Sequence, residues 1–318
     1  MLSDSFDIDI LYLSRHPTMP IGHGVIRLLK EYQSLQLSDL SISTKDLIGA
    51  DGKALFGESS PIFDHADYDG ILFFYHRALC DSRMLSTPIP LDKVGISINN
   101  EKWADSSAQV EYNNYMRGAK VISACNLNIL DEFSKYSENV LRLSQCVDNS
   151  IFYKTSLGLR RQALKKKKRF RVGWSGSPSN PLKNLNMLKK ACKIVGAEIS
   201  IASDMKRSDL NHWYNRMDVV VCASKSEGGP MMLLEAGAVG IPVISTRVGL
   251  AREIIEDGVT GLLVDWSAKS IADAISNISS NYGKSRFLAK NLNNEILNNW
   301  TYSARSSEIR AVLGRLVS

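Results

Sequence analysis

Two glutamates, Glu227 and Glu235, bracket a glycine-containing turn and are the first candidates for chemistry. If a helix begins near Gly229, Glu235 lies on its second turn, about 8 Å along the axis from the N-terminus. A diphosphate at that N-terminus would then have a sugar on the Glu227 side and a ribose within reach of Glu235. The spacing also fits a Glu227 that favours the helix dipole and a Glu235 that is a solvated surface charge. Spacing alone does not decide between these interpretations.

A strand and a helix are expected to frame this turn. Residues 218–223 are a β-branched apolar run of strand length, and residues 224–229 are small and polar. Pro230 suits the first helical position, where its missing N–H costs nothing. Residues 231–238 are helix formers, and Gly240 ends the run. This arrangement presents free backbone N–H groups to a phosphate.

The segment 227–244 (EGGPMMLLEAGAVGIPVI) resembles the E-x7-E signature of family 4 glycosyltransferases, which are retaining enzymes of the GT-B fold. The similarity continues through Gly249 and residues 253–264 (EIIEDGVTGLLV), so that about 50 contiguous residues match. The resemblance implies transfer of a sugar from a nucleotide-diphosphate sugar, with retention at the anomeric carbon. It implies no cofactor, no obligatory metal and no covalent enzyme intermediate.

The resemblance also assigns roles to individual positions. Glu227 is expected to orient the donor sugar hydroxyls, and Lys183 to neutralise charge on the leaving group, so these two are the catalytic candidates. Glu235 is expected to hold the donor ribose. The remaining donor-binding candidates come from two turns: Ser175, Gly176, Ser177, Gly228, Gly229, Pro230 and Met231.

The largest departure from the family pattern concerns the cations on the diphosphate. The family has an arginine after the first strand of its second domain, where this chain has Trp174. Its lysine follows five positions later, whereas Lys183 lies further downstream. Arg247 and Arg252 are possible substitutes, although surface charges at a helix end are the simpler interpretation.

The first domain offers weaker candidates. Gly22 and Gly24 precede a helical pattern and flank His23, so backbone could approach a ligand there, although a plain turn fits as well. His76 ends a buried strand, where α/β proteins bind ligands, but a packed or capping histidine also fits. Asn99 lies where many family members have a histidine beside the donor sugar. An amide can hydrogen-bond a hydroxyl, but it cannot do acid–base work.

Alternation of strands and helices along the chain predicts an α/β protein with doubly wound parallel sheets in two domains, facing across a cleft. We place the N-terminal acceptor domain at 1–155 and the C-terminal donor domain at 156–318. The resemblance implies that the C-terminal helix, expected at 302–317, crosses back to the first domain.

Composition excludes several classes of protein. The chain has 318 residues and no run of 18 apolar residues, so we expect no membrane span. Its acidic N-terminus lacks a basic region and does not resemble a secretory signal. Five cysteines without a C-x-x-C motif indicate reduced thiols. We therefore expect a cytoplasmic protein, either free or peripheral at the inner face of the membrane.

Net charge of +6 is concentrated in one basic run, which could contact an anionic membrane surface or DNA or be a solvated linker. The run comprises Lys165, Lys166, Lys167, Lys168 and Arg169.

We expect a glycan or lipid-linked saccharide as acceptor. Modified DNA bases are an alternative acceptor, but the run has no interleaved aromatic residues. A non-catalytic nucleotide-sugar-binding protein is the other alternative, because of Trp174 and Asn99. Base, sugar and oligomeric state are not readable from the sequence.

Overall fold

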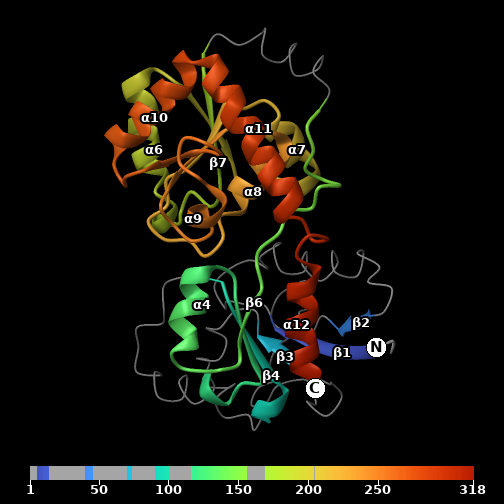
Figure 1. The fold of residues 1–318 in the computed structure, drawn as a ribbon. Coiled ribbons are helices and arrows are strands. Elements are labelled where there is room, and N and C mark those ends of the chain that lie inside the picture. The colour runs from blue at the N-terminus through green and yellow to red at the C-terminus, as the bar shows by residue number, and fades with distance from the viewer. Residues whose placement is uncertain are drawn as a thin grey trace. The chain divides into compact units, whose positions relative to one another are not determined.

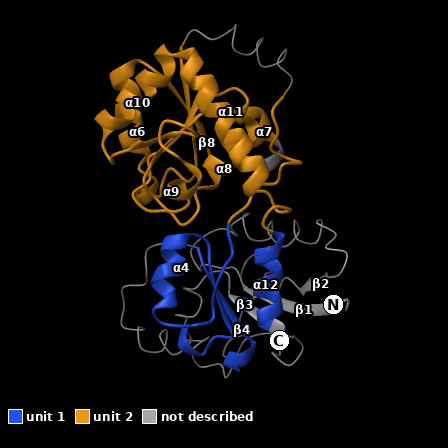
Figure 2. Ribbon diagram, in the orientation of Figure 1, with its two compact units in different colours: residues 1–144, 306–318 blue, residues 145–305 orange. Residues whose placement is uncertain are grey.

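The computed structural model describes residues 6–13, 40–45, 70–73, 90–99, 116–155, 169–203 and 205–318. The chain divides into two compact units, shown by colour in Figure 2. Unit 1 comprises residues 1–144 and 306–318, and unit 2 comprises residues 145–305. The boundary therefore precedes the predicted one at residue 155. The C-terminal helix belongs to unit 1, as expected for a helix that crosses back.

Unit 1 contains a six-stranded sheet of order β2-β1-β3-β4-β5-β6 (Figure 1). All of its neighbouring strands are parallel. Every residue of β4 and β5 is buried, as is typical of parallel strands covered on both faces. The strands are β1 (Phe6–Leu13), β2 (Leu40–Lys45), β3 (Gly70–Phe73), β4 (Val94–Ile98), β5 (Val121–Ala124) and β6 (Val140–Arg142).

The helices of unit 1 in the described ranges are α4 (Leu127–Ser134), α12 (Ser306–Val317) and the short 3-10 turn η3 (Leu91–Lys93). The last helix, α12, returns to this unit through specific contacts. The Glu308 carboxylate accepts a hydrogen bond from the backbone N–H of Ser144 at 2.7 Å. The Leu316 side chain packs closely on Gly70, where a Cβ atom would lie 2.6 Å from its Cγ atom, and it also lies against Gly95, where a Cβ atom would be 3.2 Å from it.

Unit 2 contains a five-stranded parallel sheet of order β11-β10-β9-β7-β8. Strands β9 and β10 are wholly buried, which matches their apolar sequences. The chain passes from β7 to one side of the sheet for β8 and then to the other side for β9. The carboxyl ends of β7 and β9 therefore border the topological switch point, where open α/β sheets bind ligands. The strands are β7 (Arg171–Ser175), β8 (Glu198–Ala202), β9 (Val219–Cys222), β10 (Val243–Thr246) and β11 (Leu262–Val264).

Helices cover both faces of this sheet. Helices α6 and α10 pack together on one face, and α7, α8 and α11 pack on the other (Figure 1). The helices are α6 (Leu185–Val195), α7 (Arg207–Tyr214), α8 (Met231–Val239), α9 (Ala251–Ile254), α10 (Ala268–Ser280) and α11 (Tyr282–Asn299). The predicted α/β fold with two parallel sheets is therefore confirmed.

Helix α11 was not expected from the sequence. Its residues are mostly polar, and its buried apolar stripe is narrow, consisting of Leu288, Ala289, Leu292 and Ile296. That stripe packs on α8, where Gly237 lets the two helices approach, because a Cβ atom there would lie 2.6 Å from Ile296. The Asn281 side chain caps the start of α11 by accepting a hydrogen bond from the Lys284 N–H.

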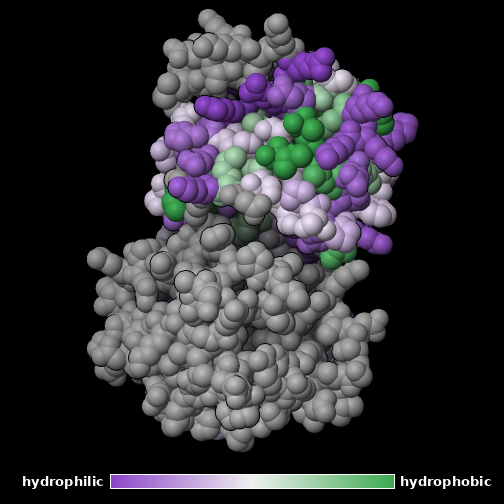
Figure 3. All heavy atoms as spheres, turned by 180° about the vertical axis from the view of Figure 1, so that it is seen from behind, coloured by the Kyte–Doolittle hydropathy of each residue, from purple (hydrophilic) through white to green (hydrophobic). Residues whose placement is uncertain are grey.

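The surface of unit 2 combines charged and apolar side chains. Figure 3 shows hydrophobic side chains gathered on one face of this unit among hydrophilic ones. Ile194, near the end of α6, and Ile201, on the edge strand β8, are both exposed. Within the described ranges, no helix has the length and apolar character needed to cross a membrane.

The packing of α11 against the end of α8 gives a testable prediction. The Asn293 side-chain amide donates to the backbone carbonyls of both Gly237 and Ala238, at 2.8 Å each. Replacing it leaves two helix-end carbonyls without that partner, so Asn293→Ala should lower the free energy of unfolding by about 1–3 kcal/mol. Chemical denaturation measures this.

Asn294→Ala is the matched control, because Asn294 is the next residue of the same helix and is exposed. Both substitutions gain the same helix propensity. Equal stability of the two variants would show that the carbonyl contacts contribute nothing.

Candidate functional site

Three loops meet at the switch point of unit 2. The first follows β7 and ends in a short 3-10 turn, η4 (Pro181–Lys183). The second is the turn 223–230 between β9 and α8, and the third is the loop 247–250 between β10 and α9. The Lys225 N–H donates to the Leu182 carbonyl at 2.8 Å, which ties the first loop to the second. The predicted catalytic residues Lys183 and Glu227 lie in these two loops.

Lys183 and Glu227 form an ion pair. The Nζ atom of Lys183 lies 2.6 Å from Oε1 of Glu227, and the two side chains are 27% and 11% exposed. The structure thus brings together two residues 44 positions apart in the sequence. The lysine reaches the turn although it lies further downstream of β7 than the family pattern has it, because η4 turns the chain back toward β9.

Two hydrogen bonds in series link the Glu227 carboxylate to Ser224 and then to Thr246. The Ser224 hydroxyl donates to Oε1 of Glu227 at 2.7 Å. The Thr246 hydroxyl, at the end of β10, donates to the Ser224 carbonyl at 2.6 Å. A carboxylate held by both an ammonium and a hydroxyl is oriented before any ligand binds. Ser224 and Thr246 were not singled out in the sequence; the available signal was a hydroxyl residue at the end of β10 and another just after the adjacent strand β9.

The loop after β10 holds the glycine turn in place. The Leu250 N–H donates to the Gly228 carbonyl at 3.0 Å. Gly249 has a φ of +43° and lies against the carbonyl oxygens of Glu227 and Gly228, so no side chain fits there. The backbone of the candidate phosphate turn is therefore defined by a contact with Gly249, a residue from the next loop.

Helix α8 starts at this turn. Its N-cap residue is Pro230, with a φ of −72° and a ψ of 88°, and no side chain caps the helix. The prediction from the sequence was that Pro230 is the first helical residue. Oε1 of Gln145 is buried, has no hydrogen-bond partner in the described structure and lies against Gly229, so a side chain at residue 229 would collide with it. Met231 is half-buried, and the rest of the helix is fully buried.

Glu235 lies on the second turn of α8, as predicted, and is 4% exposed. Its Oε2 atom accepts a hydrogen bond from the Tyr214 hydroxyl at 2.8 Å. The alternative in which Glu235 is a solvated surface charge is therefore wrong. Tyr214 was not among the residues singled out in the sequence.

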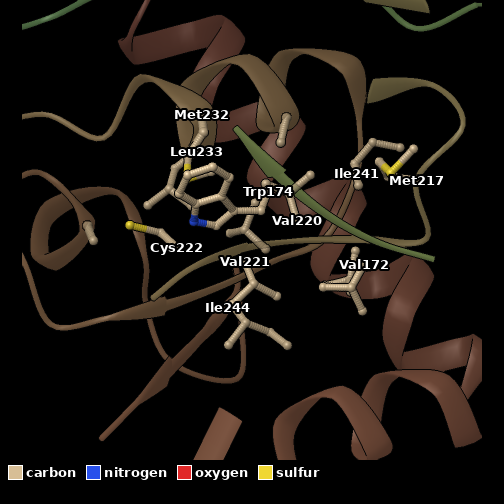
Figure 4. Close-up of a cluster of buried hydrophobic side chains, with 14 of the residues drawn as sticks. Val172, Trp174, Met217, Val220, Val221, Cys222, Met232, Leu233, Ile241 and Ile244 are labelled. Carbon is tan, nitrogen blue, oxygen red and sulfur yellow. The ribbon is translucent and has the colours of Figure 1, made fainter. Parts of the chain in front are cut away.

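Trp174 lies in the core of unit 2. It is the next-to-last residue of β7, directly before Ser175, and is 1% exposed. Figure 4 shows its indole among Cys222, Met232 and Leu233. Because Trp174 is buried and uncharged, it cannot supply the positive charge of the family arginine. The chain therefore has no cation at this position of the pattern.

The small residues after β7 lie beside Lys183. Gly176 lies between the Trp174 ring and the aliphatic chain of Lys183, and its N–H donates to the Ala202 carbonyl at 3.0 Å. Ser175 is half-buried, and Ser177 is exposed, with its hydroxyl 2.9 Å from that of Ser179. These residues stay predicted donor contacts.

Arg247 and Arg252 are both exposed. The Nε atom of Arg252 donates to the Arg247 carbonyl at 2.9 Å. The pair thus closes the loop after β10 on itself, which favours the interpretation of a helix-end surface charge.

Most of the other predicted residues lie outside the described ranges. These are Gly22, His23, Gly24, His76, Lys165, Lys166, Lys167 and Lys168. Asn99 is described: its amide donates to the buried Ser97 hydroxyl at 3.1 Å. Arg169 is exposed.

Protonation states at the site follow from burial and charge. Burial alone would lower the pKa of Lys183, but the Glu227 carboxylate more than offsets it, so the pKa is raised above 10.5. Burial, followed by the charge of Glu227, raises the pKa of Cys222. Lys183 is therefore a permanent cation, and Cys222 is a neutral, unreactive thiol. Among the described side chains, no group of three or more histidine, cysteine, aspartate and glutamate residues could hold a metal ion.

Residues 163–295 match the family model of "Glycosyl transferases group 1". This segment, which is less than half of the chain, is therefore similar to the group 1 glycosyl transferases. The matched range carries all the donor-site candidates. The predicted resemblance to a glycosyltransferase family is therefore confirmed for this segment.

Curated relatives match over short stretches. A D-inositol 3-phosphate glycosyltransferase from Arthrobacter sp. (strain FB24) is 51% identical over 57 residues, which are 18% of this chain and 14% of that protein. The Vi polysaccharide biosynthesis protein VipC/TviE from Salmonella typhi is 42% identical over 57 residues, 18% of this chain and 10% of that protein. The matches thus span well under a fifth of the length of these two relatives.

Solved structures match over nearly the whole chain. The sucrose-phosphate synthase from Thermosynechococcus elongatus has a TM-score of 0.75 at 14% identity, covering 97% of this chain and 99% of that one. HepE from Anabaena, in complex with UDP-glucose, has a TM-score of 0.69 at 17% identity, covering 96% and 99%. At these identities the likeness establishes the fold, which is the predicted GT-B fold.

The Gly249 contact predicts a strong effect of a single methyl group. Gly249→Ala should lower the free energy of unfolding by about 2–4 kcal/mol, because left-handed strain is added to a collision with backbone oxygens. Gly258→Ala is the control: Gly258 has a φ of +78° and nothing near its missing Cβ, so only the strain of about 1–2 kcal/mol applies. Denaturant unfolding measures both variants. An equal loss of unfolding free energy in the two would mean that the turn shifts to accommodate the added methyl group at no cost.

The raised pKa of Lys183 predicts the pH range of its contribution to stability. An unfolded lysine titrates near 10.5, so the ion pair contributes fully below that pH and is lost as the pH rises through the higher folded pKa. Lys183→Met should lower the free energy of unfolding by about 1–3 kcal/mol at neutral pH. The difference from the unsubstituted protein should stay constant to about pH 10 and shrink above it.

Lys189→Met, at an exposed position of α6, controls for the general loss of a positive charge. A difference that already shrinks between pH 7 and 9 would contradict the assignment of a raised pKa.

Proposed function

We propose that the chain is a retaining glycosyltransferase that moves a sugar from a nucleotide-diphosphate sugar to an acceptor. The single observation that carries the proposal is the Lys183–Glu227 pair before the start of α8, with Glu235 on the second turn of that helix. The family of residues 163–295 supports the same activity. Glycosyl transfer needs a cation for the leaving diphosphate and acceptors for sugar hydroxyls, and these side chains supply both.

Each residue has a defined task in this proposal. The diphosphate lies at the turn of Gly228 and Gly229, where the helix begins. Lys183, always protonated, neutralises the charge that develops as the glycosidic bond breaks. Glu227 accepts hydrogen bonds from donor sugar hydroxyls, and Glu235 accepts them from the ribose. The leaving phosphate provides acid–base assistance to the acceptor, so no second carboxylate is needed.

A diphosphate must compete with Glu227 for Lys183. In the described structure the lysine charge is already neutralised by the carboxylate at 2.6 Å. Binding therefore moves Lys183 toward phosphate and frees an oxygen of Glu227 for the sugar. The exchange couples arrival of the diphosphate to exposure of the sugar-binding carboxylate.

We propose UDP as the nucleotide and a glycan or lipid-linked saccharide as acceptor. The complexes of HepE with UDP and with UDP-glucose support the base. Relatives named for Vi polysaccharide biosynthesis and for D-inositol 3-phosphate support a carbohydrate or polyol acceptor. Contact of residues 165–169 with a membrane surface or DNA stays a prediction.

A non-catalytic nucleotide-sugar-binding protein is the second candidate. The burial of Trp174 favours it, because the diphosphate has one cation fewer than the family pattern supplies. Both candidate functions include binding of the nucleotide sugar, but only the glycosyltransferase turns it over.

Binding is tested by thermal melting with UDP, GDP, ADP, CDP and dTDP, without added metal. A nucleotide at 100 times its dissociation constant stabilises by about 2.7 kcal/mol. We expect UDP to raise the melting temperature. No shift with any of the five would contradict a donor site at the α8 turn.

Turnover separates the two candidates. Glu227→Gln should leave UDP binding unchanged or tighter, because Lys183 is released, while UDP release from UDP-glucose falls about 100-fold. Glu256→Gln, an exposed carboxylate of unit 2, should change neither. UDP binding without measurable turnover in the unsubstituted protein would favour the binding protein.

A further inference from the structure

Resting on the proposed function, we propose that Tyr214 is a positioning residue for the donor ribose. Its hydroxyl fixes the Glu235 carboxylate so that the carboxylate can accept hydrogen bonds from the vicinal ribose hydroxyls. Tyr214 acts through Glu235, and its removal should weaken the discrimination between ribose and deoxygenated sugars. The structure supports this in four steps.

The first step is the contact itself. The Tyr214 hydroxyl donates to Oε2 of Glu235 at 2.8 Å, and the residues are 0% and 4% exposed. A hydrogen bond to a carboxylate in a water-poor environment is strong and directional. The bond therefore fixes the rotation of the carboxylate plane about its last side-chain torsion, which is otherwise broad.

The second step is the position of the charge. Every other residue of α8 from Met232 to Val239 is apolar or glycine and buried. Burying a carboxylate among such residues opposes folding, and a well-packed apolar side chain at this position would be less costly. A buried carboxylate with a fixed orientation, eight residues after Glu227, is suited to recognising hydroxyl groups.

The third step is the rigidity of the tyrosine ring. Phe152 packs edge-on against it, with ring centroids 6.0 Å apart, and Trp213 does so at 4.9 Å. The Trp213 indole N–H donates in turn to the Ser200 hydroxyl at 2.9 Å. Because aromatic neighbours enclose the ring, its hydroxyl cannot follow a carboxylate that moves.

The fourth step is the anchoring of α7, the helix that ends at Tyr214. The Asn211 side chain accepts from the Tyr153 N–H at 3.2 Å. The Asn215 side chain accepts from the Thr155 N–H at 3.0 Å and donates to the Tyr153 carbonyl at 3.2 Å. The segment 153–155 thus holds α7 on either side of Tyr214, which gives the tyrosine a fixed support.

The test measures dissociation constants for UDP and for 2′,3′-dideoxy-UDP, which lacks both ribose hydroxyls, by isothermal titration calorimetry. The unsubstituted protein should prefer UDP by about tenfold to 100-fold, as expected for hydrogen bonds to a charged group. Tyr214→Phe removes one oxygen and keeps the ring. It should reduce this preference at least threefold by weakening UDP binding while leaving dideoxy-UDP binding nearly unchanged.

Two further variants complete the design. Glu235→Gln keeps the side-chain volume but loses the charge, and it should reduce the preference as Tyr214→Phe does. The double variant should be no worse than Glu235→Gln alone, because the tyrosine acts through the glutamate. Tyr302→Phe, at a buried tyrosine elsewhere in unit 2, is the matched control and should keep the preference.

The outcomes are distinguishable. A Tyr214→Phe protein that binds both nucleotides more weakly by the same factor, or that keeps the full preference for UDP, overturns the positioning role. Circular dichroism of each variant confirms that it is folded. If the unsubstituted protein binds neither UDP nor any other nucleoside diphosphate, the proposed function itself fails. A loss of preference in Tyr214→Phe supports both.

Discussion

One carboxylate organises the candidate site: Glu227, held on one oxygen by both the Lys183 ammonium and the Ser224 hydroxyl. Through this oxygen the loop after β7 contacts the turn after β9, and Thr246 links the turn to β10. The parallel sheet makes the contact possible, because the carboxyl ends of its strands share one edge and the strand order reverses between β7 and β9. The loops after β7, β9 and β10 and the Lys183–Glu227 ion pair therefore lie together at this edge of the sheet.

The second constraint is the burial of α8. A helix that is apolar on all sides must be covered on all sides, and the sheet, α7 and α11 cover it. Its N-terminus reaches the carboxyl edge of the sheet, and its interior carries Glu235 beside Tyr214. In the proposed function the helix thus binds the diphosphate at its N-terminus and offers a buried hydrogen-bond acceptor, Glu235, along its length. The two lie at a fixed separation because a helix has a fixed rise per residue.

Much of unit 2 could be predicted from sequence, for physical reasons. The apolar run before Ser224, the turn glycines and the Gly240 stop specify β9, the turn and α8 locally, and the E-x7-E spacing then places both glutamates. What could not be predicted depends on contacts between distant segments. Neither the Lys183–Glu227 bond nor the close approach of Gly249 to the turn has a local signal. The contact of Tyr214 with Glu235 could not be predicted because the two residues lie in different helices. Helix α11 escaped prediction because its apolar stripe is narrow and its sequence is rich in asparagine.

The most direct measurement of the central claim is a crystal structure of the chain with UDP bound. The account predicts the diphosphate at the N-terminus of α8, with the Lys183 ammonium moved from Glu227 to a phosphate oxygen. It also predicts ribose hydroxyls within hydrogen-bond distance of Glu235, and Tyr214 still bound to that carboxylate. UDP bound elsewhere, or a diphosphate at α8 with Lys183 still on Glu227 and the ribose away from Glu235, would contradict it.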